Sequence, residues 1–263
     1  MPPSYAHVVT ALRSAGCVFA EDEARLILST ARTPVELAAM VDRRAAGHPL
    51  EHVLGWAEFS GLRIAVEAGV FVPRRRTEFL VRQAVAVAPG SPVVVDLCCG
   101  SGAVGAALVA ALPGAELHAA DIDPVAVACA RRNLGTRGLV HEGDLFAPLP
   151  RRLLGRVGVL AANVPYVPTE EVGLLPPEAR DHEPLVALDG GGDGLDVLRR
   201  VAAEAPRWLA PGGALLVETS ERQAGRAVEV FISAGLVPRL EVSEELHANV
   251  VIGVRARGGG AGM

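Results

Sequence analysis

The sequence contains no lysine, and all 25 of its basic residues are arginine. We interpret this first as the codon bias of a GC-rich genome. Aromatic residues make up only 4% of the 263 residues, and no apolar run reaches the roughly 18 residues that a membrane-spanning helix needs. The first residues carry neither an early basic cluster nor a long apolar segment, so we expect no secretory signal and no membrane anchor.

Cysteine is also scarce. The chain has four cysteines and no C-x-x-C pair, which is too few for a disulfide framework in a chain of this length. Cys98 and Cys99 are adjacent, but no histidine or further cysteine lies at ligand spacing from them, so we predict no metal site there. We expect the protein to work in the reducing cytoplasm.

An excess of positive charge is missing as well. The net charge is −5: residues 1–80 hold nine arginines and nine acids, and residues 81–263 hold sixteen arginines and twenty-one acids. Proteins that bind nucleic-acid phosphates usually present a basic face. We therefore expect no direct nucleic-acid binding. Half of the residues are apolar, and the chain is long enough to bury a sizeable core.

Strand-like and helix-like segments alternate from residue 93 onward. Val93–Asp96 is a continuous apolar run that ends in an acid, as in a strand buried on both faces. The alternation predicts an α/β fold with a mostly parallel sheet covered by helices. The further strands are expected at 115–120, 139–142, 157–162, 213–219 and as a pair around 236–255, the helices at 103–112, 124–134, 194–209 and 221–234, and a long loop at 164–193.

The first 46 residues have the pattern of helices. Thr33 followed by Pro34 is typical of a helix start, with the threonine as N-cap and the proline in the first turn. Gly47-His48-Pro49 interrupts the helical pattern, and residues 50–73 look like a short connector with strand character. Thr77 is then expected to cap the next helix.

A glycine-rich turn follows the first buried strand. Residues 100–105 match G-x-G-x-x-G between a strand and a helix, and Asp121 stands about twenty residues later, where a carboxylate can accept both ribose hydroxyls. This spacing alone fits NAD, FAD or S-adenosylmethionine. Asp96 favours S-adenosylmethionine, because a carboxylate beside the turn suits a cationic donor and repels a pyrophosphate. Asp144, after the third strand, is placed to bond an adenine amino group.

A second polar turn, Asn163-Val164-Pro165-Tyr166, ends the fourth strand. If the first and fourth strands are neighbours, this turn faces the glycine turn at the carboxyl edge of the sheet. The Asn163 side-chain oxygen and the Val164 carbonyl can accept the N–H bonds of a planar nitrogen, Pro165 stiffens the turn, and Tyr166 offers a face for stacking. Two such acceptors suit methyl transfer to an amide or amine.

These motifs resemble those of the HemK/PrmC family, the protein-(glutamine-N5) methyltransferases of peptide-chain release factors. The resemblance covers roughly residues 45–255. It is carried by the segments Gly47–Gly55, Phe59–Leu62, Val72–Glu78, Asp96–Gly102, Asp121–Pro124, Asn163–Tyr166 and Arg180–Gly191.

The resemblance implies a fold, a donor and an acceptor. The implied fold is a Rossmann-like, seven-stranded methyltransferase sheet with a small helical N-terminal domain and a connecting hairpin. S-adenosylmethionine would be the donor, and a glutamine side chain of a release factor would be the acceptor. We expect the protein to be a monomer. We expect the divisions 1–48 (helical domain), 49–75 (hairpin connector), 76–257 (methyltransferase domain) and 258–263 (flexible tail).

The resemblance also implies which residues form the site. The amide would be bound and oriented by the Asn163–Tyr166 turn, to which we assign the catalytic and substrate-binding roles. Donor contacts are assigned to Asp96, Cys98, Cys99, Gly100, Ser101, Gly102, Asp121, Ile122, Asp144, Leu145 and Asn163.

Three features depart from the family pattern. Val164 stands where a proline is usual, Arg76 replaces an acid before Thr77, and the N-terminal helical region is short. Other functions therefore stay open at this point. They are a methyltransferase for a nucleobase amine or a small molecule, a nicotinamide oxidoreductase, and a non-catalytic donor-binding module in which Val164 prevents transfer.

Overall fold

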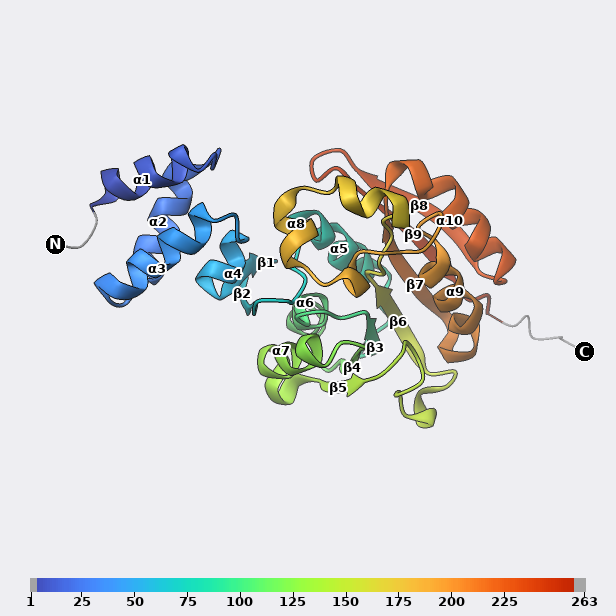
Figure 1. Ribbon diagram of the computed structural model, residues 1–263. Coiled ribbons are helices and arrows are strands. Elements are labelled where there is room, and N and C mark those ends of the chain that lie inside the picture. Colours follow the sequence, from blue (N-terminus) through green and yellow to red (C-terminus); the bar gives the residue numbers. More distant parts are fainter. Residues whose placement is uncertain (1–3, 258–263) are drawn as a thin grey trace, which may run out of the picture.

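Four N-terminal helices precede the sheet in this computed structural model, which describes residues 4–257 (Figure 1). The tail predicted at 258–263 lies outside the described residues. The helices enclose an apolar core of their own, built on side chains such as Val8, Leu12 and Ile27. They are α1 (Tyr5–Ser14), α2 (Ala20–Thr30), α3 (Pro34–Ala45) and α4 (Leu50–Leu54).

Two predicted helix caps have different outcomes. Thr33 caps α3 as predicted, because its hydroxyl accepts the Glu36 N–H at 3.1 Å. The prediction for Thr77 is wrong. Thr77 lies inside the 3-10 turn η1 (Arg75–Thr77) with helical backbone angles, and its side chain forms no cap. The helical turn has already begun at Arg75, so an N-cap at Thr77 comes too late.

The connector contains a helix and a hairpin. The helix α4 replaces the strand character expected at its start, and it ends at Gly55, whose φ of 78° is left-handed. The hairpin pairs β1 (Trp56–Phe59) with β2 (Leu62–Ala65) through a two-residue turn with positive φ at both positions. The hairpin is bonded to the following region, because the Ala65 N–H donates to Asn133 Oδ1 at 2.8 Å. The domain boundaries expected from the sequence stay a prediction.

A seven-stranded mixed sheet forms the centre of the larger part of the molecule, which confirms the predicted fold class. Its first five strands are parallel, and β9 runs antiparallel to both of its neighbours. The spatial order is β5 (Leu139–Glu142), β4 (Glu116–Asp121), β3 (Val93–Leu97), β6 (Val157–Ala162), β7 (Leu209–Thr219), β9 (Ala248–Val254) and β8 (Val237–Ser243).

Helices cover both faces of the sheet, so that two apolar cores lie on either side of it (Figure 1). One face carries α5 (Glu78–Val87), α6 (Ala103–Ala111) and α7 (Pro124–Leu134). The other carries α9 (Asp196–Trp208) and α10 (Glu221–Ser233). Short 3-10 turns follow α7 and precede β6: η2 (Gly135–Arg137) and η3 (Arg151–Leu153).

The long segment 164–193 has more structure than the loop we expected. It contains η4 (Thr169–Leu174), α8 (Pro177–His182) and η5 (Leu185–Ala187). Prolines at 168, 176 and 184 stand immediately before these pieces, where a fixed φ favours a new helical turn. In Figure 1 this segment lies over the carboxyl end of the sheet.

The sheet order places the two predicted turns at one edge. The strands β3 and β6 are direct parallel neighbours, with Leu97 opposite Ala162 in the register. Both strands are buried, apart from partial exposure at Val93. The glycine turn and the Asn163 turn therefore follow neighbouring strand ends, as the sequence predicted.

None of the helices within residues 4–257 has the length and apolarity to cross a bilayer.

Candidate active site

A cavity of about 500 Å³ opens beyond the carboxyl ends of β3, β4 and β6. The glycine turn, the end of β4, the Asp144 segment, the Asn163 turn and α8 together line it. All but one of the predicted site residues lie in its wall. The exception is Gly102, where φ is +77° and an added Cβ would lie 3.1 Å from Ala130 Cβ, so this glycine serves the packing of α6 against α7.

The Asp121 carboxylate braces the glycine turn. Its Oδ2 accepts the Gly100 N–H at 2.8 Å and its Oδ1 accepts the Asp123 N–H at 3.0 Å. Burial raises the pKa of Asp121, and the two amide donors oppose that shift. A carboxylate oxygen has two lone pairs, so the expected bonds to ribose hydroxyls remain available beside the backbone bonds.

Asp96 is the most buried carboxyl of the cavity wall, with 1% of its surface exposed. Its Oδ2 accepts the Gly105 N–H at 2.8 Å. Burial raises the pKa of Asp96 to about 7; the Asp121 charge adds to the rise and the Gly105 N–H opposes it. Gly105 makes room for this close approach, because a Cβ would lie 3.1 Å from Asp96 Oδ2. The carboxyl is thus poised to ionise when a cation arrives.

Asp144 has a partner that the sequence did not reveal. Its Oδ2 forms an ion pair with Arg200 of α9, and both side chains are about half exposed. Arg200 lies in the cavity wall. An adenine amino group would therefore share the Asp144 carboxylate with this guanidinium. The two residues are 56 positions apart, and no local pattern links them.

The Asn163 side chain carries an acceptor without a partner. Its Oδ1 is buried in the cavity wall and bonds to no atom of residues 4–257. The neighbouring Val164 is 2% exposed, and within the same residues no donor contacts its carbonyl oxygen. A buried acceptor left unpaired costs about 1–3 kcal/mol. Two free acceptors on one turn indicate a place for a ligand with two N–H groups.

Tyr166 is held from its hydroxyl end. The hydroxyl donates to Glu218 Oε1 at 3.3 Å and accepts from Arg76, and the Arg76 guanidinium lies 5.9 Å from the ring centroid. Arg76 also pairs with Glu218 at 3.0 Å. Burial, followed by the Glu218 charge, raises the pKa of Tyr166 to about 12. Arg76, which departs from the family pattern, therefore has a partner in Glu218, a strand-end residue that no sequence motif marked as functional.

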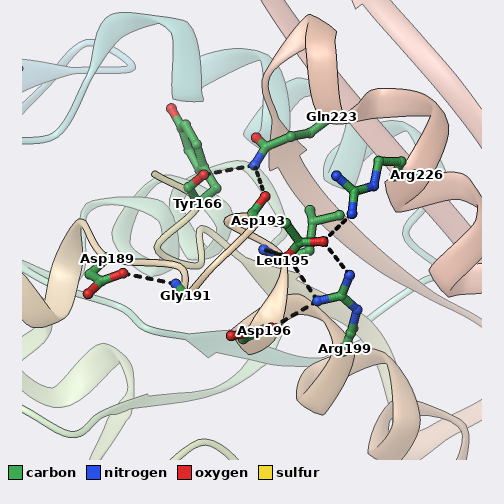
Figure 2. Close-up of polar contacts among 9 residues, drawn as sticks. All are labelled: Tyr166, Asp189, Gly191, Asp193, Leu195, Asp196, Arg199, Gln223 and Arg226. Carbon is green, nitrogen blue, oxygen red and sulfur yellow. Dashed lines mark hydrogen bonds and ion pairs between the residues drawn. The ribbon is translucent and has the colours of Figure 1, made fainter. Parts of the chain in front are cut away.

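The backbone of the Asn163 turn is anchored from behind (Figure 2). Gln223 of α10 donates to the Tyr166 carbonyl at 2.9 Å and to the Asp193 carbonyl at 3.0 Å. The Asp193 side chain accepts from the Leu195 N–H and from Arg199 and Arg226, and the hydrogen bond from Arg199 is the main cause that lowers the pKa of Asp193 to about 2. The turn is thereby tied to both α9 and α10.

Glycines allow this anchoring to be close. A Cβ at Gly190 would lie 2.7 Å from the Pro165 carbonyl, and one at Gly194 would lie 2.3 Å from the Tyr166 carbonyl. Gly194 also has a φ of +76°. Gly190 and Gly194 therefore let two backbone segments touch behind Tyr166.

Known proteins match this chain over most of its length. The family described as methyltransferase small domain matches residues 61–152. A protein of Geobacter sulfurreducens named release factor glutamine methyltransferase is 39% identical over 84% of this chain and 79% of its own length. One of the same name from Streptomyces coelicolor is 41% identical over 73% of this chain and 70% of its own length. The chain belongs to the release factor glutamine methyltransferase family.

The family assignment makes the chain an enzyme of the methyltransferase class. It decides against the nicotinamide oxidoreductase and against the non-catalytic binding module. Among solved structures, a methyltransferase from Pyrococcus furiosus has a TM-score of 0.57, with 16% sequence identity, and covers 74% of this chain and 90% of its own. That likeness shows the methyltransferase fold.

Proposed function

We propose that this enzyme transfers a methyl group from S-adenosylmethionine to the side-chain amide nitrogen, N5, of a glutamine in a peptide-chain release factor. The names of the relatives support this substrate. The unpaired Asn163 Oδ1 in the cavity wall carries the proposal on the structural side, because an amide –NH2 is the kind of group that it and the Val164 carbonyl would pair.

The donor end of the cavity fits a cationic cofactor. S-adenosylmethionine supplies, when bound, an electrophilic methyl group on a sulfonium. The residues that would hold it are Cys98–Ser101 of the glycine turn, Asp121 and Leu145, which line one cavity. Asp96 would add a buried negative charge beside them. The carboxyl can take that charge at neutral pH, since its pKa is about 7 without a ligand.

The acceptor end would activate a nitrogen that is a poor nucleophile. The lone pair of an amide nitrogen is delocalised, and positive charge develops on the nitrogen as that lone pair attacks the methyl group. The bond between sulfur and methyl would break in the same step, and the methylated nitrogen would then lose one proton to water. Asn163 Oδ1, which is buried, and the Val164 carbonyl would accept one N–H each and stabilise this charge. The same two bonds would fix the direction in which the lone pair points.

Tyr166 would hold the plane of the amide. Its hydroxyl is restrained by Arg76 and Glu218, and its carbonyl by Gln223. Because both the ring hydroxyl and the backbone of Tyr166 are restrained, the side chain loses little freedom when a flat group stacks on its ring. Orientation, and not a strong base, would therefore supply much of the rate.

The direct test is labelling of purified release factors. The full chain is incubated with donor carrying a labelled methyl group and with intact release factors, and the methyl is mapped by mass spectrometry. We expect one label on a glutamine side-chain amide. An unlabelled glutamine together with label on RNA or a metabolite in a parallel reaction would overturn the proposal.

A further inference from the structure

One wall of the cavity is fastened to the N-terminal helices. Glu178 and Ala179 of α8 line the cavity, as do Pro49 and Glu51 from the connector. Arg44, on α3, donates from Nη1 to Glu178 Oε1 at 2.7 Å. The two residues are 134 positions apart, so this bond joins the start of the chain to the segment that follows the Asn163 turn.

Arg44 is itself held rigidly. Its Nε and Nη2 donate to the two carboxylate oxygens of Glu23 at 2.6 and 3.1 Å, and its Nη1 also donates to the His48 carbonyl at 3.0 Å. Only 7% of Arg44 is exposed. Burial lowers the pKa of Arg44, but the hydrogen bonds that it donates to Glu23 and Glu178 outweigh this effect and raise the pKa. The guanidinium therefore presents a fixed charge to α8.

A second contact joins the same two parts. The rings of His48 and His182 lie 4.2 Å apart between centroids, at the other end of α8. Neither histidine belongs to the cavity wall. The helix α8 thus meets the N-terminal region both at its start and at its end.

We propose that Arg44 is a positioning residue for the acceptor: through Glu178 it holds α8 as the wall against which the acceptor segment lies. The inference rests on the proposed function. The donor residues follow the ends of β3, β4, β5 and β6, and none of them bonds to Arg44 or Glu178 within residues 4–257. If α8 is docked in only a fraction of molecules, the apparent affinity for the acceptor falls to that fraction of its full value, and the affinity for the donor stays the same.

Steady-state kinetics at varied concentrations of release factor test the role of the Arg44–Glu178 ion pair. We expect Glu178→Ala and Arg44→Lys each to raise KM for the acceptor about five- to tenfold, the effect of losing one hydrogen bond of ordinary strength, because the Glu178 side chain is about half exposed. Lysine keeps the charge opposite Glu23 but lacks the fork that serves three partners. The turnover number and the donor dissociation constant should not change. Glu178→Gln should restore part of the loss.

The control is Asp181→Ala on the same helix. It removes the same charge, but among residues 4–257 Asp181 pairs only with its neighbour Arg180, so KM should stay at the wild-type value. The double variant of Arg44 and Glu178 should be no worse than either single variant. A raised KM in Glu178→Ala with a normal KM in Arg44→Lys would mean that Glu178 touches the acceptor directly, and would overturn the proposal.

Amide hydrogen exchange provides a reading without any acceptor. Residues 177–187 should exchange faster in Glu178→Ala and in Arg44→Lys than in the wild type and in Asp181→Ala. Unchanged exchange in Glu178→Ala would refute the role of the pair. If the wild type labels no glutamine, the proposed function fails, but the exchange experiment still decides whether Arg44 holds α8.

Discussion

Lowering the pH from 8 to 6 should weaken donor binding through Asp96. This carboxyl is 1% exposed, and burial is the main cause that raises its pKa to about 7 in the ligand-free protein. A sulfonium and an ammonium favour the ionised form. Below the pKa, binding of the donor must therefore release a proton from Asp96, and that step costs affinity.

The size of the effect follows from the pKa. With a value of about 7, roughly nine-tenths of the carboxyl is ionised at pH 8 and roughly one-tenth at pH 6. The apparent dissociation constant for the donor should rise about tenfold between these two pH values. Above pH 8 it should level off, because the carboxylate is then fully formed.

Calorimetry in two buffers of different ionisation enthalpy measures both quantities, the affinity and the number of protons released. Asp96→Asn is the control, because its side-chain oxygen can still accept the Gly105 N–H. This variant should bind the donor more weakly and with little dependence on pH. Equal wild-type affinity at both pH values without proton release would refute the argument. An unchanged slope in Asp96→Asn would assign the titration to Asp121, whose pKa burial also raises.

The same group affects the stability of the ligand-free fold with the opposite sign. The folded pKa of about 7 lies above the ordinary value of 3.8, so between these values the folded state binds more protons than the unfolded state. The free energy of unfolding should therefore fall as pH rises through this window, as far as Asp96 is concerned. This fall in the free energy of unfolding is complete about one pH unit above the folded pKa. Denaturant titrations at several pH values should show the fall in the wild type but not in Asp96→Asn.

The remaining predictions concern the acceptor turn. Asn163→Ala should lower the turnover number at least about a hundredfold and leave the melting temperature unchanged, because its Oδ1 has no partner to lose; near-normal turnover would contradict its role. Val164→Pro should keep activity within about twofold, since Val164 N–H donates no hydrogen bond within residues 4–257; an inactive variant would show that the turn needs valine. Gly194→Ala should lower both the melting temperature and the turnover number, because its Cβ would lie 2.3 Å from the Tyr166 carbonyl and from Gln223 Nε2; wild-type values in thermal and kinetic assays would show that the anchoring behind Tyr166 is dispensable.

Features that depend on neighbouring residues were predictable from the sequence. The buried runs of β3 and β6, the glycine turn and the position of Asp121 follow from local patterns, and parallel strands bring their ends to one edge. Partners chosen across the fold were not predictable. Arg76 meets Glu218 over 142 positions, and such a pairing depends on the register of a distant strand. The helix α8 was missed because six residues give too short a periodic pattern.

The replacement of the family's usual proline by Val164 has little effect on the rigidity of the turn. A proline there would restrict the turn from within, by fixing its own φ. In this chain the turn is fixed from outside. Val167 pairs with the returning segment through bonds to Leu188 and Gly190 at 3.0 and 2.8 Å, and Gln223 holds the Tyr166 carbonyl. Because these bonds act on the backbone just after Val164, the two acceptor oxygens keep their direction without a second proline.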